Sequence, residues 1–165
     1  MTVLPQRKPH RLEHNIYEQP GAYFITICSH NRQCTFWKEG ASIDYPLSTN
    51  HLSHIGLAID KQIAEISKHY ADVRVDNYTI MPNHVHLLLT NYLLLNGRAM
   101  HAPTTNIITV VQQFKGIVTK QFGFPIWQKS FHDYVIRNEK GYRFIYEYIS
   151  NNPYRWEADR LNPFF

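Results

Sequence analysis

Hydrophobic side chains follow two spacings along the chain, and the first is typical of β-strands. Residues 21–28 form an aromatic and β-branched run with turn residues on both sides, which predicts a buried strand. Residues 73–81 and 84–90 predict two more strands, and only a Pro-Asn pair separates them, so we expect a hairpin or a bulged continuation there. Residues 130–137 predict a fourth strand.

The second spacing, in steps of three and four residues, predicts helices. A stripe of apolar residues predicts a helix over 51–70, and a similar stripe predicts a second helix that ends near Gly123. Asn138 can cap a third helix. This helix is expected to stop at Asn152, because a proline follows and the residue before a proline avoids helical backbone.

The order of these elements is strand, helix, strand, strand, helix, strand, helix. This order predicts an α+β fold, a ferredoxin-like or RRM-like sandwich in which an antiparallel sheet has its helices packed mainly on one face. The other face would then be left for function. We expect a single domain over 1–165, with a basic arm at 1–20, a central core at 21–152 and a tail at 153–165.

Composition narrows the class of protein. A hydrophobic fraction of 44% is enough for a buried core, and no apolar run is long enough to span a membrane. The first residues lack the apolar stretch of an export signal, and two cysteines cannot form a disulfide framework, so we expect a cytoplasmic protein. The net charge of +4 permits a polyanionic partner without requiring one.

His84 and His86 are the first candidate functional residues. Residues two apart on a strand point to the same face with Cα atoms roughly 6.5–7 Å apart, so the two imidazoles can bind one divalent ion. Val85 would anchor the opposite face in the core, and the histidines are expected to face a functional surface instead. Taken alone, such a pair is more often two hydrogen-bonded surface histidines.

Tyr148 and Asn152 are the second candidates, because they lie four residues apart at the end of the third predicted helix and project from the same side. A phenol is a weak nucleophile at its ordinary pKa of about 10, but it becomes useful opposite a metal-polarised phosphodiester. Asn152 can supply an oxygen ligand for Mg²⁺ or Mn²⁺. Each residue alone fits a core aromatic or a helix cap. Together with the histidines, they indicate tyrosine-mediated cleavage of a nucleic-acid strand.

The sequence also resembles a known family. Residues 81–88, MPNHVHLL, closely resemble the metal-binding segment of the Y1 transposases of the HUH (His-hydrophobe-His) nuclease superfamily. Residues 21–32 and 127–138 resemble the first and last strands of that family, and residues 148–153 resemble its tyrosine helix. Asn152 after a three-residue gap, and the tail that follows it, look like the REP-associated tyrosine transposases.

The resemblance implies a metal-dependent endonuclease and strand transferase that acts on single-stranded DNA. In this reading Tyr148 forms a 5′-phosphotyrosine link, and His84, His86 and Asn152 hold Mg²⁺ or Mn²⁺. The expected substrate is a strand with imperfect hairpins formed by palindromic repeats, and the expected location is the nucleoid. The resemblance is compatible with a monomer or a homodimer.

Basic residues are the candidates for contacts with the DNA backbone, although ordinary solvated side chains are the alternative for each. We prefer Lys115 and Lys120, because the second predicted helix is expected to meet the functional edge of the sheet. The full candidate set is Arg7, Lys8, Arg11, Lys115, Lys120 and Arg137.

Two other functions compete with this reading. The first is a domesticated protein that binds hairpin DNA with little or no turnover. The second is a zinc-dependent hydrolase that uses His84 and His86. The hydrolase is disfavoured, because no HExxH motif, third histidine or neighbouring carboxylate accompanies the pair in the sequence.

Overall fold

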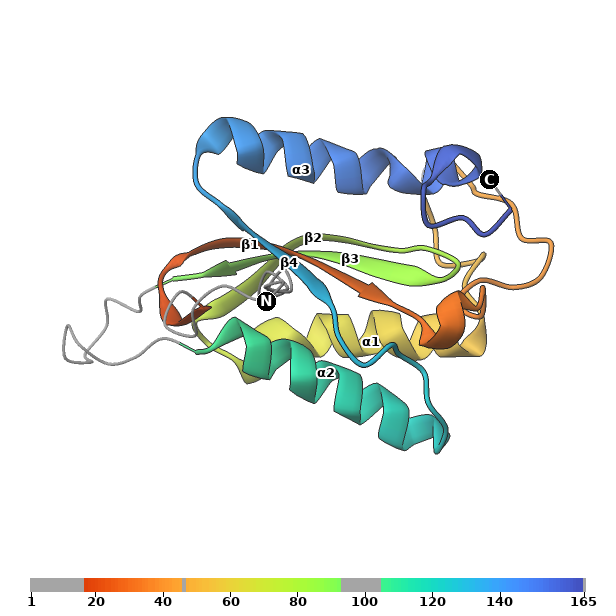
Figure 1. Ribbon diagram of the computed structural model, residues 1–165, viewed down its shortest axis with the longest axis horizontal. Coiled ribbons are helices and arrows are strands. Elements are labelled where there is room, and N and C mark those ends of the chain that lie inside the picture. The colour runs from red at the N-terminus through yellow and green to blue at the C-terminus, as the bar shows by residue number, and fades with distance from the viewer. Residues whose placement is uncertain (1–16, 46, 93–104, 165) are drawn as a thin grey trace, which may run out of the picture.

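Four strands form one antiparallel sheet in the computed structural model, which describes residues 17–45, 47–92 and 105–164 (Figure 1). The strand order across the sheet is β2-β3-β1-β4, as a ferredoxin-like fold requires. Each of the four lies where the hydrophobic pattern predicts a strand: β1 Gly21–Cys28, β2 Val73–Ile80, β3 His84–Asn91 and β4 His132–Ile136.

The helices lie on both faces of this sheet. Helices α1 (His54–His69) and α2 (Ile107–Phe122) cover one face, and α3 (Glu139–Asn151) crosses the other (Figure 1). The predicted α+β fold is confirmed. Helix α3 covers part of the face that was expected to be left for function. The Asn77 side chain of β2 holds α3 there by donating a hydrogen bond to the Tyr146 carbonyl at 2.9 Å.

The main core lies between the sheet and the helices α1 and α2. Alternate residues of β1 and β3 point into it, which is the strand periodicity of a sheet face packed on helices. A second, smaller cluster lies on the other face, where Ile149 of α3 packs on Leu88 and Ile136. The main core is built on these side chains: Ile25, Ile27, Ile59, Ile63, Val85, Leu87, Leu89, Val111, Phe114 and Val118.

Capping residues set the helix ends where the sequence places them. The Asn138 side chain accepts a hydrogen bond from the Gly141 amide and begins α3. Gly123 ends α2 in the left-handed conformation, with φ of 75°, that glycine adopts without steric cost. Helix α3 ends at Asn151, next to the predicted stop, but Asn152 keeps helical backbone, with φ of −60° and ψ of −41°, although a proline follows. The chain continues as the 3-10 helix η3 (Asn152–Ala158) and folds back over the sheet.

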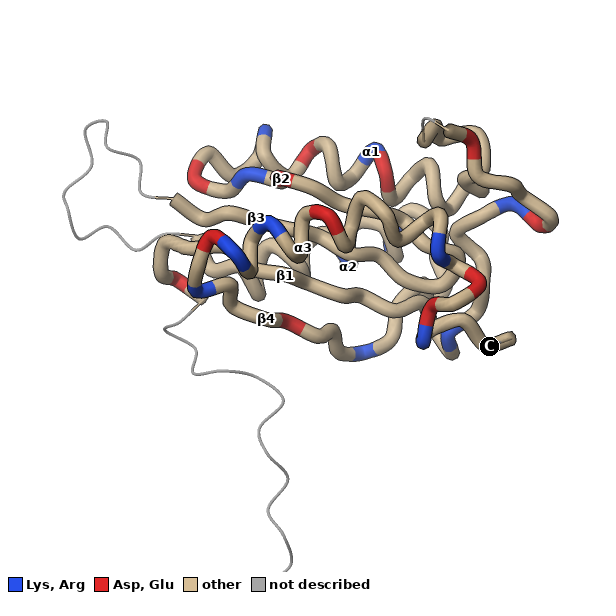
Figure 2. The backbone as a smooth tube through the Cα atoms, turned by 90° about the horizontal axis from the view of Figure 1, so that it is seen from above, with Lys and Arg blue, Asp and Glu red and all other residues tan. Residues whose placement is uncertain are grey.

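The charged side chains are mixed in sign over the described residues. Figure 2 shows lysine and arginine positions interspersed with aspartate and glutamate positions along α1 and α3. No helix in this part of the chain is both long and apolar enough to cross a bilayer.

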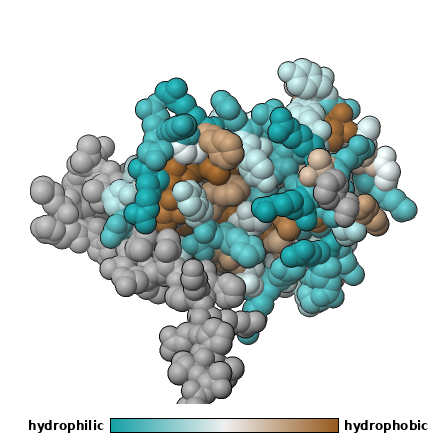
Figure 3. All heavy atoms as spheres, turned by 45° about the horizontal axis from the view of Figure 1, so that its top comes forward, coloured by the Kyte–Doolittle hydropathy of each residue, from teal (hydrophilic) through white to brown (hydrophobic). Residues whose placement is uncertain are grey.

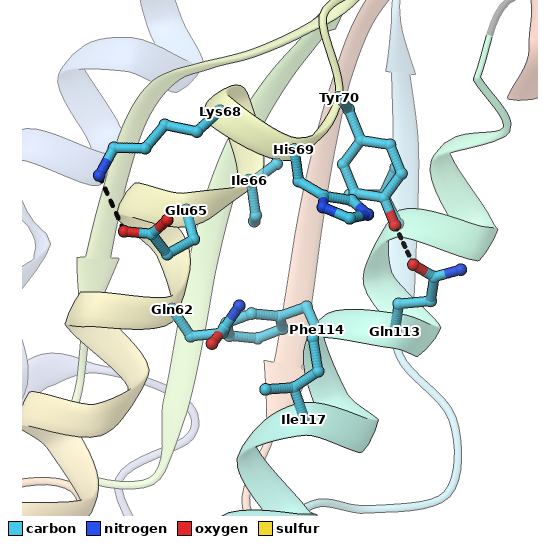
Figure 4. Close-up of a pocket in the computed structure, with 10 residues that line it drawn as sticks. Gln62, Glu65, Ile66, Lys68, His69, Tyr70, Gln113, Phe114 and Ile117 are labelled. Atoms are coloured by element: carbon cyan, nitrogen blue, oxygen red, sulfur yellow. Dashed lines mark hydrogen bonds and ion pairs between the residues drawn. The ribbon is translucent and has the colours of Figure 1, made fainter.

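A hollow of about 360 Å³ lies between α1 and α2, on the opposite side of the sheet from α3 (Figure 4). Ile66 and Phe114 form part of its apolar wall. At its rim Lys68 forms an ion pair with Glu65, with 2.8 Å between Nζ and Oε1. The hollow has no contact with the histidine pair.

Gly56 is required by a close approach between α1 and the loop before it. A Cβ at this position would lie 2.2 Å from the carbonyl oxygen of Phe36. Gly56→Ala should therefore lower the free energy of unfolding by about 1–3 kcal/mol, the usual cost of overpacking. The measurement is chemical denaturation followed by circular dichroism.

The control for this prediction is Gly116→Ala in α2, where an added Cβ would meet nothing within 4 Å. This change should raise the free energy of unfolding by about 0.4–1 kcal/mol, because alanine restricts the unfolded chain. Equal effects of the two substitutions would contradict the close approach at Gly56.

Candidate active site

The two histidines lie at the start of β3, on the sheet face that α3 crosses. His84 pairs across the sheet with Cys28 of β1, and His86 pairs with Thr26. Their Nε2 atoms lie only 3.1 Å apart. The expected face is correct, but the rings are not on an open surface: their exposed fractions are 0% and 3%, because α3 and the chain after it cover them.

Hydrogen bonds to the Nδ1 atoms hold both rings in place. Asn83 Oδ1 lies 2.8 Å from His84 Nδ1, and Thr26 Oγ1 lies 2.8 Å from His86 Nδ1. Asn83 is itself fixed, since its Nδ2 donates to the Leu161 carbonyl at 2.7 Å. These partners leave both Nε2 atoms directed at the same point, as the groups that orient histidine ligands of a metal do.

Burial keeps both imidazoles neutral. It lowers the pKa of His84 well below its usual value, and the neighbouring His86 lowers it further. Burial alone lowers the pKa of His86 to about 3. Because a metal ion binds the neutral ring, neither histidine has to lose a charge at neutral pH before it can act as a ligand.

Tyr148 and Asn152 meet the histidines from α3. The Tyr148 ring lies 5.4 Å from the His86 ring and packs edge-on against Phe24 at 6.0 Å. Its exposed fraction is 41%, so the phenol borders the buried pair while still reaching solvent. Asn152 is buried beside it, and the Asn152 Nδ2 makes no hydrogen bond within the described residues.

The surroundings of Tyr148 disfavour its phenolate. Burial raises the pKa of Tyr148, and the Asp159 carboxylate raises it further. The Asn152 amide and the Arg160 guanidinium act in the opposite direction and offset part of that shift. The hydroxyl is therefore protonated at neutral pH.

Asp159 is a site residue that the sequence analysis missed. Its Oδ2 lies 3.8 Å from His84 Nε2, and its side chain is almost fully buried. The Leu161 amide donates to Asp159 Oδ1 at 2.7 Å and so fixes the carboxylate. The sequence shows no carboxylate close to the histidine pair, but the fold supplies one. The chain of η3 brings Asp159 back to His84, which lies 75 residues earlier in the sequence. Only the likeness of the tail to a known family pointed to this segment.

The donor atoms present fit a divalent ion. Two ligands at about 2.1 Å from one ion, set at right angles, lie about 3 Å apart, which matches the 3.1 Å between the Nε2 atoms. Within the described ranges no cluster of three or more His, Cys, Asp or Glu side chains is arranged to hold a metal. Among the described residues, the third protein donor would be the amide oxygen of Asn152, which is buried beside Tyr148.

Of the basic candidates, the structure describes Lys115, Lys120 and Arg137. Lys115 and Lys120 lie on α2, whose apolar stripe docks on the main core at the other face of the sheet, so their contact with DNA stays a prediction. Lys115 Nζ also donates to the Gln128 carbonyl at 2.7 Å. Arg137 is exposed between β4 and α3.

The arm residues Arg7, Lys8 and Arg11 lie outside the described residues, so their expected contacts with DNA stay predictions.

On the α3 side of the molecule, hydrophobic side chains gather in a visible patch rather than being evenly spread (Figure 3). Exposed aromatic side chains of this side are Tyr134, Phe144, Tyr146 and Tyr148.

Comparison with known proteins finds similarity to a curated protein sequence and to solved structures. An uncharacterized protein of Haemophilus influenzae is 35% identical to the chain, over 94% of this chain and 92% of that protein. Among solved structures, the REP-associated tyrosine transposase bound to a REP hairpin matches with a TM-score of 0.58 and 20% identity, over 96% of this chain and 77% of that one. No protein-family model matches. The structural match confirms the expected Y1 transposase fold.

Asp159→Asn should lower the pKa of Tyr148. The Asp159 carboxylate disfavours the phenolate, so removing its charge while keeping its size brings the pKa of the phenol closer to its ordinary value. The measurement is an NMR titration of tyrosine labelled at the ring carbon beside the hydroxyl, with the Tyr148 signal assigned by its loss in Tyr148→Phe.

Glu157→Gln is the matched control for this prediction. It removes one negative charge from the same segment, but Glu157 is exposed and is not among the groups that shift the pKa of Tyr148. An Asp159→Asn variant whose Tyr148 titrates as in the parent protein would contradict the placement of the carboxylate.

Proposed function

We propose that this chain cleaves and rejoins single-stranded DNA through a covalent tyrosine intermediate. The chain belongs to the same protein family as the uncharacterized Haemophilus influenzae protein, and it has the fold of the REP-associated tyrosine transposase. The observation that carries the proposal is the meeting of Tyr148 with two neutral imidazoles whose Nε2 atoms converge. Neither feature alone would suffice, because buried histidine pairs and surface tyrosines both occur in proteins without catalytic function.

The protein side chains have two roles: some would hold the metal ion, and Tyr148 would attack the phosphate. His84, His86 and Asn152 would hold Mg²⁺ or Mn²⁺, since imidazole and amide oxygen suit these ions. The bound ion would supply positive charge that stabilises negative charge developing on the phosphate oxygens. Phe24 and His86 pack against the Tyr148 ring and fix the direction from which its hydroxyl approaches.

The reaction is a transesterification. The Tyr148 oxygen forms a bond to the scissile phosphorus, the bond from phosphorus to the 3′-oxygen breaks, and the proton of the phenol ends on the 3′-hydroxyl that leaves. The 5′-phosphate stays linked to Tyr148. Attack by a different 3′-hydroxyl reverses these steps and rejoins the strand, so no nucleoside triphosphate is consumed.

Other tyrosines of α3 are less suited to this attack. Burial and the nearby Asp76 carboxylate raise the pKa of Tyr142 to about 12. The ring of Tyr146 packs against that of Tyr142, at a centroid distance of 6.4 Å, and projects from nearly the opposite side of the helix to Tyr148. Tyr148 is therefore the nucleophile we propose.

The proposed substrate is a single strand that folds into imperfect hairpins. The neighbour with the same fold supports this proposal, because it is bound to a REP hairpin, and the net positive charge of the chain is compatible with it. A protein that binds such hairpins with little or no turnover is the second candidate. The burial of the histidines favours this second candidate, because a phosphate can approach them only if the covering segment moves.

Tyr148→Phe should abolish the covalent adduct with DNA and leave binding of the hairpin unchanged. The substitution keeps the ring and its contacts with Phe24 and His86 but removes the attacking oxygen. The measurement is a denaturing gel of a labelled hairpin strand incubated with Mg²⁺ or Mn²⁺, alongside a binding titration in the same buffer.

Tyr146→Phe is the control, and it should form the adduct at the parent rate. An adduct in Tyr148→Phe, mapped to Tyr142 or Tyr146, would overturn the assignment of the nucleophile. Binding of the hairpin by the parent protein without any adduct would favour the second candidate.

Asn152→Ala should reduce cleavage by about 10–100-fold, the usual range for loss of a group that supports a metal. The activity should recover in part at high Mn²⁺, because mass action restores occupancy of a weakened site. The measurement is the rate of cleavage as a function of Mn²⁺ concentration. Asn151→Ala, at an exposed neighbour, should match the parent. A loss that Mn²⁺ leaves unchanged would assign Asn152 to a purely structural role.

A further inference from the structure

The hydrogen bonds of Asn83 fix the position of the ring proton on His84. The amide nitrogen of Asn83 faces two carbonyl oxygens, that of Leu161 at 2.7 Å and that of Arg32 at 3.4 Å. Its oxygen must then face His84 Nδ1, at 2.8 Å. An amide oxygen only accepts, so His84 Nδ1 carries the proton and His84 Nε2 presents a lone pair.

This lone pair determines the state of the second histidine in the metal-free protein. His86 Nε2 lies 3.1 Å from His84 Nε2, and two facing lone pairs at that distance would repel. His86 Nε2 therefore carries a proton and donates it to His84. The other nitrogen, His86 Nδ1, is then an acceptor, so the hydroxyl of Thr26 donates to it across 2.8 Å.

A divalent ion at this site needs the opposite state of His86. Both Nε2 atoms must then present lone pairs, so His86 has to carry its proton on Nδ1. One proton leaves His86 Nε2 for solvent, and one arrives at His86 Nδ1 from solvent. The ring stays neutral and no net proton is released.

We propose that Thr26 is a positioning residue that allows His86 to change tautomer when the divalent ion binds. A hydroxyl is both donor and acceptor, so Thr26 bonds His86 Nδ1 in either state by rotating its hydrogen. A carbonyl or amide oxygen at this place would lock the ring in one state, as Asn83 does for His84. This inference rests on the proposed metal site.

The first test uses the parent protein without DNA. Long-range ¹H–¹⁵N spectra of the imidazole nitrogens distinguish the two tautomers of each histidine. We expect His86 to be protonated on Nε2 in metal-free buffer and on Nδ1 at saturating Mg²⁺, whereas His84 stays protonated on Nδ1 in both. A His86 that already carries its proton on Nδ1 without metal would overturn the proposal.

The second test measures Mn²⁺ affinity by electron paramagnetic resonance. Thr26→Val should weaken binding by about 10–100-fold, as losses of such supporting hydrogen bonds do. Thr26→Ser keeps the hydroxyl, and with it the hydrogen bond to His86 Nδ1, so it should bind Mn²⁺ about as tightly as the parent.

Thr79→Val is the matched control. Thr79 is the other cross-strand partner of His86 and is also buried, but its hydroxyl contacts Met81 Sδ rather than the ring. Thermal unfolding of each variant checks that it is folded. Equal Mn²⁺ affinity in Thr26→Val and the parent would overturn the role of Thr26.

The two proposals can fail separately. If the parent binds Mn²⁺ and Thr26→Val binds it equally well, only the role of Thr26 is lost. If the parent binds neither Mg²⁺ nor Mn²⁺, both the metal site and this inference are lost. Neither result depends on the presence of a DNA substrate.

Discussion

The burial of β3 on both faces is the constraint on which the structure depends. One set of its alternate side chains, Val85, Leu87 and Leu89, fills the main core under α1 and α2. The other set carries the histidines and Leu88 toward α3. A shift of one residue in the pairing of β3 with β1 would exchange the two sets, so the main core fixes the register that brings His86 to Thr26.

The same constraint explains how polar groups can be buried here at acceptable cost. An unpaired imidazole in such a place would be strongly destabilising. Each ring is paired at Nδ1 through a neighbour that the sheet itself supplies, Thr26 from β1 and Asn83 from the turn between β2 and β3. The fold and the arrangement of the site are therefore held by the same strand pairing.

The pattern of hydrophobic residues was enough to predict the four strands and the three helices, and turn residues predicted the cap at Asn138 and the helix end at Gly123, because each depends on local sequence. The face chosen by α3 was not predictable, since its apolar stripe fits either side of a sheet. The residues Tyr148, Asn152 and the histidine pair could be named from motif spacing. Asp159, Asn83 and Thr26 could not be assigned a role, because only tertiary contacts bring them to the rings.

The bond from Asn83 to the Leu161 carbonyl joins residues 78 positions apart. Such a contact depends on the whole fold, because only the finished sheet and the segment that follows α3 bring these two residues side by side. The position of the ring proton on His84 is therefore a property of the tertiary structure and not of any local stretch of sequence.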